Sequence, residues 1–275
     1  MPAYYLRHYA EVETPMITVL TPTFNRAHTL PRLFDSLMNQ SVREFEWLVV
    51  DDGSSDGTPE LIDGFRDAAP FKVRCLVQGN GGKHTALNEG VKAAAGDWVF
   101  IVDSDDMLVV NAIETATAAI HELSKDSVVG LCYRKMFESG RYVGVDQVQE
   151  DHCHMTPTDA SHSLKGDLAY IFRRETMLLH PFPIIAREKF VPELFIWNKI
   201  SDEGDIIFFP NTAIYICEYL EDGYSQNFKR NLRKNPRGFG IHYLAQIGRE
   251  KRPVMKAKCL IRYLQCKWFA WRNAL

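Results

Sequence analysis

Two kinds of hydrophobic pattern alternate along the first 110 residues of the chain. Short runs rich in Val, Ile, Leu, Phe and Trp are typical of strands buried in a parallel sheet, and they occupy residues 16–20, 47–50, 71–77 and 98–102. Between them, apolar residues three or four positions apart predict helices over 31–39, from about residue 59, and over 85–95. Strands that alternate with helices predict an α/β fold, with a mainly parallel sheet whose loops gather along one edge. A mixed or antiparallel part is expected between residues 128 and 216.

Polar or glycine-rich loops follow all four predicted strands. In chain order they are Thr21-Pro22-Thr23-Phe24-Asn25-Arg26, Asp51-Asp52-Gly53-Ser54-Ser55, Gly79-Asn80-Gly81-Gly82-Lys83 and Asp103-Ser104-Asp105-Asp106. Ligands of open α/β sheets bind outside the carboxyl ends of the strands. Three carboxylates within four positions raise each other's pKa unless a cation neutralises them. They suit Mg²⁺ or Mn²⁺ bound together with substrate phosphates, although a solvated Asp-rich turn is the alternative.

Composition and missing motifs exclude several classes of protein. The chain has 275 residues, 46% hydrophobic and 12% aromatic, which is enough for a sizeable core. Neither G-x-G-x-x-G after the first strand nor G-x-x-x-x-G-K-[ST] occurs, which argues against dinucleotide cofactors and P-loop chemistry. No apolar run approaches the ~18 residues of a membrane span, and residues 1–15 lack a signal peptide's apolar core. Six cysteines without C-x-x-C pairs argue against zinc and for a reducing compartment, so a cytoplasmic location is expected.

The net charge of −3 hides a strong asymmetry between the body and the tail. From Ser225 to Leu275 the chain carries 13 basic residues against one acidic residue, a net charge of +12. We predict an α-helical tail from Gly238, in which residues 256–272 mix bases with Leu, Tyr, Trp and Phe at near-helical spacing. Such a helix suits an anionic membrane surface, here the inner face of the cell membrane. The alternative is a helix docked on the body with its basic face in solvent.

The strand-end motifs together resemble the family 2 glycosyltransferases, which have a GT-A (Rossmann-like) fold. The residues that carry the resemblance are Ile17 to Arg26, Leu48 to Thr58, Asn88-Glu89-Gly90 and Asp103 to Asp106, in matching order and spacing. A weaker resemblance to bacterial enzymes that build capsule, exopolysaccharide or O-antigen chains runs through Phe182-Pro183, Glu188 to Glu193 and Glu218 to Ser225. It implies a catalytic domain over 1–225, with a nucleotide-binding half at about 16–110 and an acceptor-binding half at about 111–225. Residues 226–275 form a basic helical extension.

The resemblance implies a nucleotide-sugar donor, usually a UDP-sugar, and transfer that inverts the anomeric centre. Asp105 matches the metal ligand of the family, and Asp103 matches the residue that faces the ribose and the metal. Asp52 matches the acid that accepts a hydrogen bond from the uracil. Further donor contacts are expected from Pro22, Thr23, Phe24, Arg26, Ser104 and Lys83. Lys83 suits a diphosphate because it lies in a glycine-rich loop ahead of a helix N-terminus.

An inverting transfer needs a base that removes the proton of the acceptor hydroxyl. Glu193 is the first candidate and Glu188 the second, because only one acid of the family's usual acidic pair is present near this position. Glu193 could instead complement a helix dipole. Asp167 is a candidate contact of the donor sugar or the acceptor. Asp51 is expected to fix its turn, and Asp106 to cap the following segment or to ligate the metal.

Three other functions were weighed against a glycosyltransferase that adds a sugar to a glycan or polyprenyl-linked saccharide. A nucleotidyltransferase also uses aspartates at strand ends, but it usually has a basic glycine-rich loop after the first strand. A non-catalytic member of the same fold would bind a sugar nucleotide or glycan without turnover. A nucleic-acid binder would explain the basic tail but not the acidic strand ends, which repel phosphate without a metal.

Overall fold

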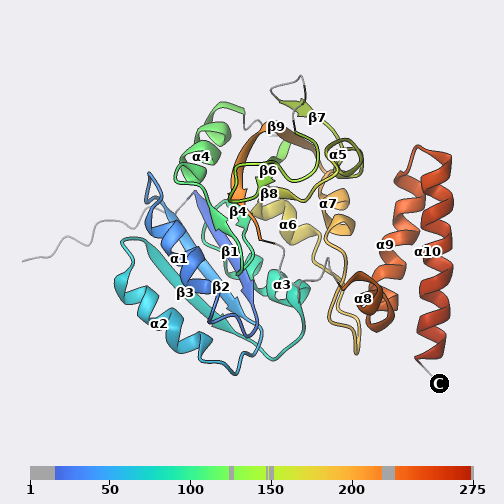
Figure 1. The fold of residues 1–275 in the computed structure, drawn as a ribbon, viewed down its shortest axis with the longest axis horizontal. Helices are drawn as coiled ribbons and strands as arrows, with labels where there is room; N and C mark the ends of the chain where they lie inside the picture. The colour runs from blue at the N-terminus through green and yellow to red at the C-terminus, as the bar shows by residue number, and fades with distance from the viewer. Residues whose placement is uncertain (1–15, 124–126, 147, 149–151, 219–226, 274–275) are drawn as a thin grey trace, which may run out of the picture.

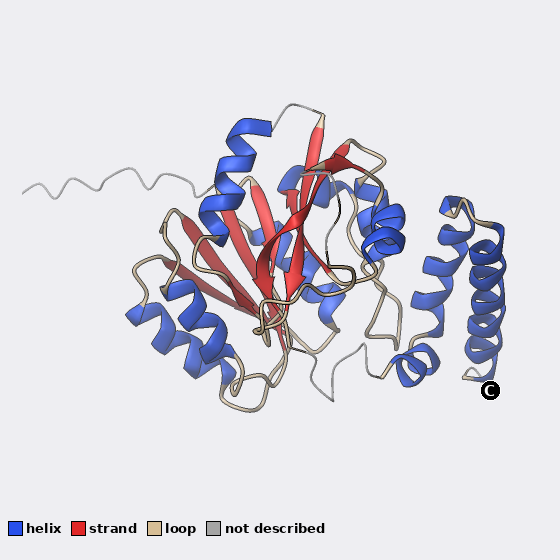
Figure 2. Cartoon of the chain, turned by 45° about the horizontal axis from the view of Figure 1, so that its top comes forward, coloured by secondary structure: helices blue, strands red, loops and turns tan. Residues whose placement is uncertain are grey.

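A mixed β-sheet with helices on both faces forms the body of the molecule (Figure 1, Figure 2). The computed structural model describes residues 16–123, 127–146, 148, 152–218 and 227–273. The strands are β1 (Ile17–Thr23), β2 (Phe45–Asp51), β3 (Lys72–Val77), β4 (Trp98–Ile101), β5 (Met107–Leu108), β6 (Val128–Met136), β7 (Cys153–His154), β8 (Leu168–Arg173) and β9 (Asp205–Ile216). The helices are α1 (Leu30–Met38), α2 (Thr58–Ala68), α3 (Lys83–Ala93), α4 (Ala112–Leu123), α5 (Pro157–Leu164), α6 (Arg174–Leu179), α7 (Leu194–Ile200), α8 (Phe228–Lys234), α9 (Pro236–Arg249) and α10 (Pro253–Arg272).

The strand order is β3-β2-β1-β4-β8-β6-β9-β5, and β7 pairs with β9. Strands β3, β2, β1 and β4 are parallel, whereas β8 is antiparallel to both of its neighbours. The chain moves outward from β1 to β3 and then returns to place β4 on the other side of β1. This reversal creates a crevice at the carboxyl ends of β1 and β4, where doubly wound folds bind their ligands. The predicted α/β fold with a mixed, mainly parallel sheet is confirmed.

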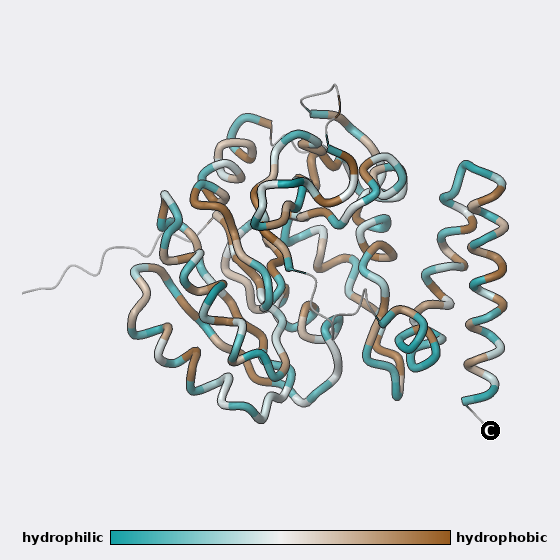
Figure 3. The backbone as a smooth tube through the Cα atoms, viewed as in Figure 1, coloured by the Kyte–Doolittle hydropathy of each residue, from teal (hydrophilic) through white to brown (hydrophobic). Residues whose placement is uncertain are grey.

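The sheet is buried on both faces, which explains the near-continuous apolar runs in its strands. Side chains of β1 and β2 alternate, so that Val19 and Trp47 pack under α1, α2 and α4. Leu20 and Leu48 point to the opposite face, under α3, α5, α6 and α7. Figure 3 shows hydrophobic strands in the middle of the body, with more hydrophilic segments around them. The two predicted halves share this sheet, and the boundary between them at about residue 110 stays a prediction.

Helical structure begins earlier than the predicted helix start at Gly238, because α8 starts at Phe228, within the extension predicted over 226–275. Helices α9 and α10 form an antiparallel pair beside the body (Figure 1). One side of α10 packs against α8 and α9, and its residues Cys259, Cys266 and Phe269 are buried. No helix within the described ranges combines the length and the apolarity that crossing a bilayer requires. All six cysteines are free thiols, and four of them are buried.

A ring of hydrogen bonds between buried side chains joins α9 to the body. The amide of Asn198 on α7 donates to Gln246 on α9 at 3.2 Å, and Gln246 donates to the hydroxyl of Thr158 on α5 at 2.9 Å. Thr158 closes the ring by donating to Asn198 at 3.0 Å. Because each of these groups would be unsatisfied without the others, the ring fixes α9 relative to α7.

Asn88 on α3 is a structural residue. Its side-chain amide donates to the carbonyl of Phe182 at 2.9 Å and accepts from the Phe182 N–H at 2.8 Å. The Phe182-Pro183 segment is thereby held against α3.

We predict that Asn88→Ala destabilises the fold, because it leaves both buried backbone groups of Phe182 without a partner. Each unpaired group costs about 1–3 kcal/mol, and each kcal/mol lowers the melting temperature by about 2–4 °C. Thermal unfolding followed by circular dichroism measures the change. Glu89→Ala, at the adjacent exposed position, is the control and should stay within about 0.5 kcal/mol of wild type. Equal melting temperatures for the two variants would contradict the role of Asn88.

Candidate active site

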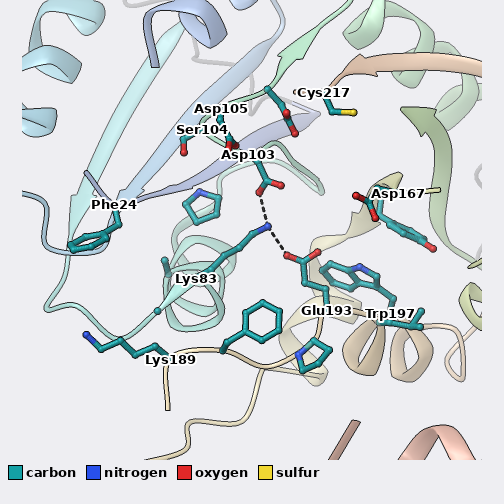
Figure 4. A pocket seen from close by; sticks show the side chains of 18 of the residues that line it. Phe24, Lys83, Asp103, Ser104, Asp105, Asp167, Lys189, Glu193, Trp197 and Cys217 are labelled. Carbon is teal, nitrogen blue, oxygen red and sulfur yellow. Dashed lines mark ion pairs between the residues drawn. The ribbon is translucent and has the colours of Figure 1, made fainter. Parts of the chain in front are cut away.

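A cavity of about 1050 Å³ opens at the carboxyl ends of β1, β2 and β4 and extends to the C-terminal helices. One side of it is lined by the residues predicted to bind a nucleotide-sugar donor, and we call it the donor side. The fold brings these residues together from separate loops: Pro22, Thr23, Phe24, Arg26, Asp52, Lys83, Asp103, Ser104 and Asp105. On the opposite side it is lined by residues of the second half and the extension, including Asp167, Glu193 and His242. Figure 4 shows Phe24 and Asp167 on opposite sides of Lys83.

Asp52 organises the glycine-rich loop that precedes α3. Its carboxylate accepts hydrogen bonds from the N–H groups of Gly81 and Gly82, each at 2.7 Å, and from the amide of Gln78 at 2.7 Å. These three donors leave part of the carboxylate's acceptor capacity for a ligand.

Asp51 is fully buried and accepts from the backbone N–H of Ser54 at 3.1 Å, so its predicted turn-fixing role is confirmed.

The three aspartates that follow β4 lie in three different environments. Burial would raise the pKa of Asp103, but the charges of Lys83 and Lys135 outweigh burial and lower it. Burial and the neighbouring charge of Asp103 raise the pKa of Asp105. Burial also raises the pKa of Asp106, to about 6, against the opposing charge of Lys135 at 3.6 Å.

Asp106 has a structural contact, but with a distant strand end and not with the following segment that it was expected to cap. Its side chain accepts a hydrogen bond from the backbone N–H of Glu218 at 3.1 Å, just beyond the end of β9. The predicted motif from Glu218 to Ser225 otherwise lies outside the described residues. Glu218 itself forms an ion pair with Arg32 of α1.

Lys83 connects the two sides of the cavity. Its ammonium nitrogen lies 2.6 Å from Asp103 Oδ1 and 2.7 Å from Glu193 Oε1 (Figure 4). Burial alone would lower the pKa of Lys83, but the two carboxylates outweigh it and raise the pKa above its ordinary value. Lys83 is therefore a permanent cation between a donor-side carboxylate and the candidate base.

The two candidate bases lie in very different places. Glu193 is the N-cap residue of α7, lines the cavity and is only partly exposed. Glu188 is not among the described residues that line the cavity. Its carboxylate accepts from the N–H groups of Arg237 and Gly238 at 2.9 and 2.8 Å, in the first turn of α9. The interpretation of Glu188 as the second candidate base therefore finds no support, because its acceptor oxygens cap a helix.

The segment that leads to Glu193 is held between two glycines. A Cβ at Gly82, whose φ is +98°, would lie 2.1 Å from the carbonyl oxygen of Lys189. A Cβ at Gly238 would lie 2.3 Å from the carbonyl oxygen of Phe190. Both positions therefore require glycine, because any side chain would push the backbones apart.

Two polar residues of the site were missed by the sequence analysis. The hydroxyl of Tyr215 on β9 accepts a hydrogen bond from the N–H of Asp103 at 2.9 Å. The ammonium of Lys135 on β6 lies 3.9 Å from the centroid of the Tyr215 ring. Both residues lie near the carboxyl end of a strand, and this position in the sequence is typical of residues that line a ligand site in α/β folds. Their register against Asp103 depends on sheet pairing that a single sequence does not show.

Asp103 and Asp105 fit a divalent cation held together with the phosphates of a ligand. Within the described ranges, no three His, Cys, Asp or Glu side chains form a group that could hold a metal ion. Mg²⁺ commonly binds through one or two carboxylates and completes its shell with substrate phosphates and water. The raised pKa of Asp105 fits such a site, because a nearby cation would stabilise the charged form that burial and Asp103 disfavour.

A mixed, mainly parallel sheet with acidic residues at its strand ends is typical of the GT-A fold. The comparisons with known proteins agree with this fold. The model of "Glycosyl transferase family 2" matches residues 18–189, so the chain belongs to this family. The glycosyltransferase GlyG of Streptococcus pneumoniae serotype 4 is 31% identical over 180 residues, which are 64% of this chain and 58% of GlyG. The chain thus spans less than two thirds of that relative.

Solved structures of two glycosyltransferases share the fold. The structure of S. aureus TarS 1–349 in complex with UDP-GlcNAc has a TM-score of 0.66 and 24% identity, covering 91% of this chain and 72% of that one. The mannosyltransferase PcManGT from Pyrobaculum calidifontis, in complex with GDP-Man and Mn²⁺, has a TM-score of 0.59 and 22% identity, covering 92% and 69%. These likenesses establish the fold.

We predict that Asp52→Ala loosens the glycine-rich loop. The substitution removes the acceptor of the Gly81 and Gly82 N–H groups, so both amides should exchange with deuterium at least about tenfold faster, as expected when a hydrogen bond to a charged group is lost. Hydrogen exchange measured by NMR or mass spectrometry reports the change. Asp63→Ala on the exposed face of α2 removes the same charge without touching the loop and serves as the control. Unchanged exchange at Gly81 and Gly82 would rule out this role for Asp52.

Proposed function

We propose that the protein transfers a sugar from a UDP-sugar to a glycan or polyprenyl-linked saccharide, with inversion, in bacterial surface polysaccharide synthesis. The observation that carries this proposal is the position of Lys83 between Asp103 and Glu193 in one cavity. A carboxylate next to the proposed donor position and a candidate base, both paired with one ammonium, would suit a transferase that works by a single displacement. A non-catalytic binder would have no need for a base next to its donor residues.

The donor would lie along the carboxyl ends of β1, β2 and β4. Pro22, Thr23 and Phe24 frame the base, Asp52 accepts a hydrogen bond from uracil, and Arg26 and Ser104 contact the ribose and phosphates. The lining of the cavity by all of these residues supports this placement. So does the structural neighbour TarS, which was solved with UDP and with UDP-GlcNAc.

Asp105, with Asp103, would hold Mn²⁺ or Mg²⁺ against the diphosphate. Such a cation, when bound, stabilises negative charge on the departing diphosphate. Lys83 lies in the first turn of α3 and adds a positive charge on the same side. The neighbours PcManGT and GalNAc-T7, both solved with Mn²⁺, support a metal of this kind.

The transfer itself is one displacement in which Glu193 removes the proton. The oxygen of an acceptor hydroxyl forms a bond to the anomeric carbon while the bond from that carbon to the phosphate oxygen breaks. The nucleoside diphosphate leaves with the bonding electron pair, and the hydroxyl proton passes to the carboxylate of Glu193. The ion pair with Lys83 orients that carboxylate before the acceptor arrives.

The outer face of α10 would hold the enzyme on an anionic membrane, where a polyprenyl-linked acceptor resides. This face consists of exposed large apolar residues spaced as one stripe of a helix: Val254, Leu260, Ile261, Leu264, Trp268 and Trp271. Exposed bases border the stripe, among them Lys256, Lys258, Lys267 and Arg272. Apolar and aromatic residues bordered by bases suit the boundary between headgroups and acyl chains.

Asp105→Ala should abolish the part of turnover that depends on divalent metal, because the substitution removes the principal proposed ligand. Sugar transfer or donor hydrolysis is measured with UDP-sugars while MnCl₂ is titrated. Asp97→Ala, just before β4, removes a carboxylate outside the cavity and is the control. Undiminished metal-stimulated turnover in Asp105→Ala would show that this aspartate is not the ligand.

Glu193→Gln should lower kcat by about 10²–10⁴-fold, the usual contribution of a positioned base. UDP binding, measured by calorimetry, should persist and should be tighter than binding of GDP or CDP. Glu188→Gln is the matched control, since Glu188 caps α9 and lies outside the cavity lining; it should lower stability more than kcat. A Glu193→Gln enzyme with normal kcat would exclude Glu193 as the base.

The full chain should co-sediment with vesicles that contain phosphatidylglycerol at low salt and separate from them at high salt. The Debye length falls from ~10 Å at 0.1 M to ~3 Å at 1 M, which weakens attraction between exposed charges. The variant Ile261→Ser, Leu264→Ser, Trp271→Ser should lose binding without disturbing the buried contacts of α10 with α9. Phosphatidylcholine vesicles are the neutral control. If the wild type does not bind anionic vesicles but forms dimers, and the variant is monomeric, the outer face of α10 is instead a contact with a second copy of the chain.

A further inference from the structure

The C-terminal extension forms part of the cavity wall, a role that neither the membrane-binding helix nor the docked helix expected from the sequence included. Phe239, His242 and Tyr243 of α9 line the same cavity as Glu193, together with Phe228 at the start of α8. Positions 239, 242, 243 and 246 lie three or four residues apart, so they share the face of α9 that meets the body. Gln246, the last of them, belongs to the hydrogen-bond ring with Asn198 and Thr158.

The aromatic rings on this wall form a continuous surface. The ring centroids of Phe190 and Phe239 are 5.3 Å apart, those of Phe228 and Phe239 are 5.6 Å apart, and those of His242 and Tyr243 are 5.0 Å apart. Phe190, Phe228 and Tyr243 are only half-buried, so parts of their rings remain accessible. Faces of this kind bind flat apolar surfaces while hydroxyl and imidazole groups at their edges bind polar atoms.

His242 adds an unsatisfied polar atom to this wall. Its side chain is 9% exposed, and its Nδ1 is buried without a hydrogen-bond partner among the described residues. Burial lowers the pKa of His242 to about 4, so the ring is neutral and offers one donor and one acceptor. Burial also raises the pKa of Tyr243 to about 12, which keeps its hydroxyl protonated. A buried polar atom without a partner usually indicates a missing ligand or water.

Two sets of contacts fix this wall relative to the candidate base. The hydrogen-bond ring joins α9 to α7, whose N-cap residue is Glu193. Glu188 caps the first turn of α9, five residues before Glu193 in the chain. The aromatic wall and the base therefore belong to one rigid arrangement, as a subsite for the reacting acceptor requires.

We propose that Phe239, His242 and Tyr243 of α9, with Phe190 and Phe228, form the acceptor subsite and bind a pyranose ring of the acceptor saccharide. A pyranose presents an apolar C–H face and a rim of hydroxyls, which match an aromatic wall bordered by imidazole and phenol groups. The proposal rests on the proposed glycosyltransferase function and names the elements that bind its acceptor. It moves the acceptor site partly out of residues 111–225 and into the helical extension.

Saturation-transfer NMR with the full chain and UDP tests this proposal, with a panel of methyl α- and β-pyranosides as probes. His242→Phe preserves a ring of similar size and removes both nitrogens, while Tyr243→Phe removes only a hydroxyl. Each should weaken binding of the preferred glycoside by about 3–10-fold, the effect of one lost hydrogen bond. Leu244→Ala, which changes an exposed residue on the outer side of α9, is the matched control and should bind the glycoside as wild type does.

Calorimetry of UDP with the same proteins separates failure of the subsite from failure of the proposed function. UDP should bind equally to wild type and to all three variants, because none of them lies on the donor side. Equal glycoside binding by wild type, His242→Phe and Tyr243→Phe would overturn the subsite and leave the donor site intact. Octyl pyranosides serve as a second set of probes. Octyl glycosides that bind more tightly than the methyl glycosides, regardless of the sugar, would also overturn the subsite, because the wall would then bind a lipid chain. Absence of UDP binding in wild type would instead contradict the proposed function.

Discussion

One ammonium group between two carboxylates holds the centre of this molecule together. Asp103 comes from the end of β4 and Glu193 from the beginning of α7, and both lie within 2.7 Å of the Lys83 nitrogen. Two carboxylates at such close quarters in a partly buried cavity would repel each other strongly without a cation between them. Lys83 in turn depends on Asp52, which fixes the glycine-rich loop from which α3 starts. The positive charge of Lys83 therefore stabilises both the donor side of the cavity and the candidate base.

The first half of the fold could be predicted from sequence because local signals there agree with one another. Strands such as residues 47–50 are continuously apolar, and each is followed at once by polar or glycine-rich residues. Since parallel strands end at the same edge, the meeting of Asp52, Lys83 and Asp103 follows from chain order alone. Asp51 shows the same agreement, because a fully buried carboxylate before a Gly-Ser turn has the backbone donors of that turn within reach.

The second half could not be predicted in the same detail, because its contacts are formed by residues far apart in the sequence. Lys135 and Tyr215 reach the aspartates only through the pairing of β6 with β9, whose register contains irregularities. Glu193 and Glu188 are the first and second candidate bases from the sequence, yet Glu188 caps α9 and only Glu193 faces the cavity. The net charge of the extension can be counted from the sequence, but the inward face of α9 is set by the ring of Thr158, Asn198 and Gln246. Sequence spacing alone does not show that these three polar residues meet.

The two glycine contacts around the segment that ends at Glu193 have a mechanical consequence. Lys189 and Phe190 are packed so closely against Gly82 and Gly238 that neither neighbour can shift without moving the segment. Any side chain at either glycine would displace this segment, and with it the start of α7 that carries Glu193. The position of the candidate base therefore depends on the absence of a side chain at two positions that lie far apart in the sequence, and not only on the charges around it.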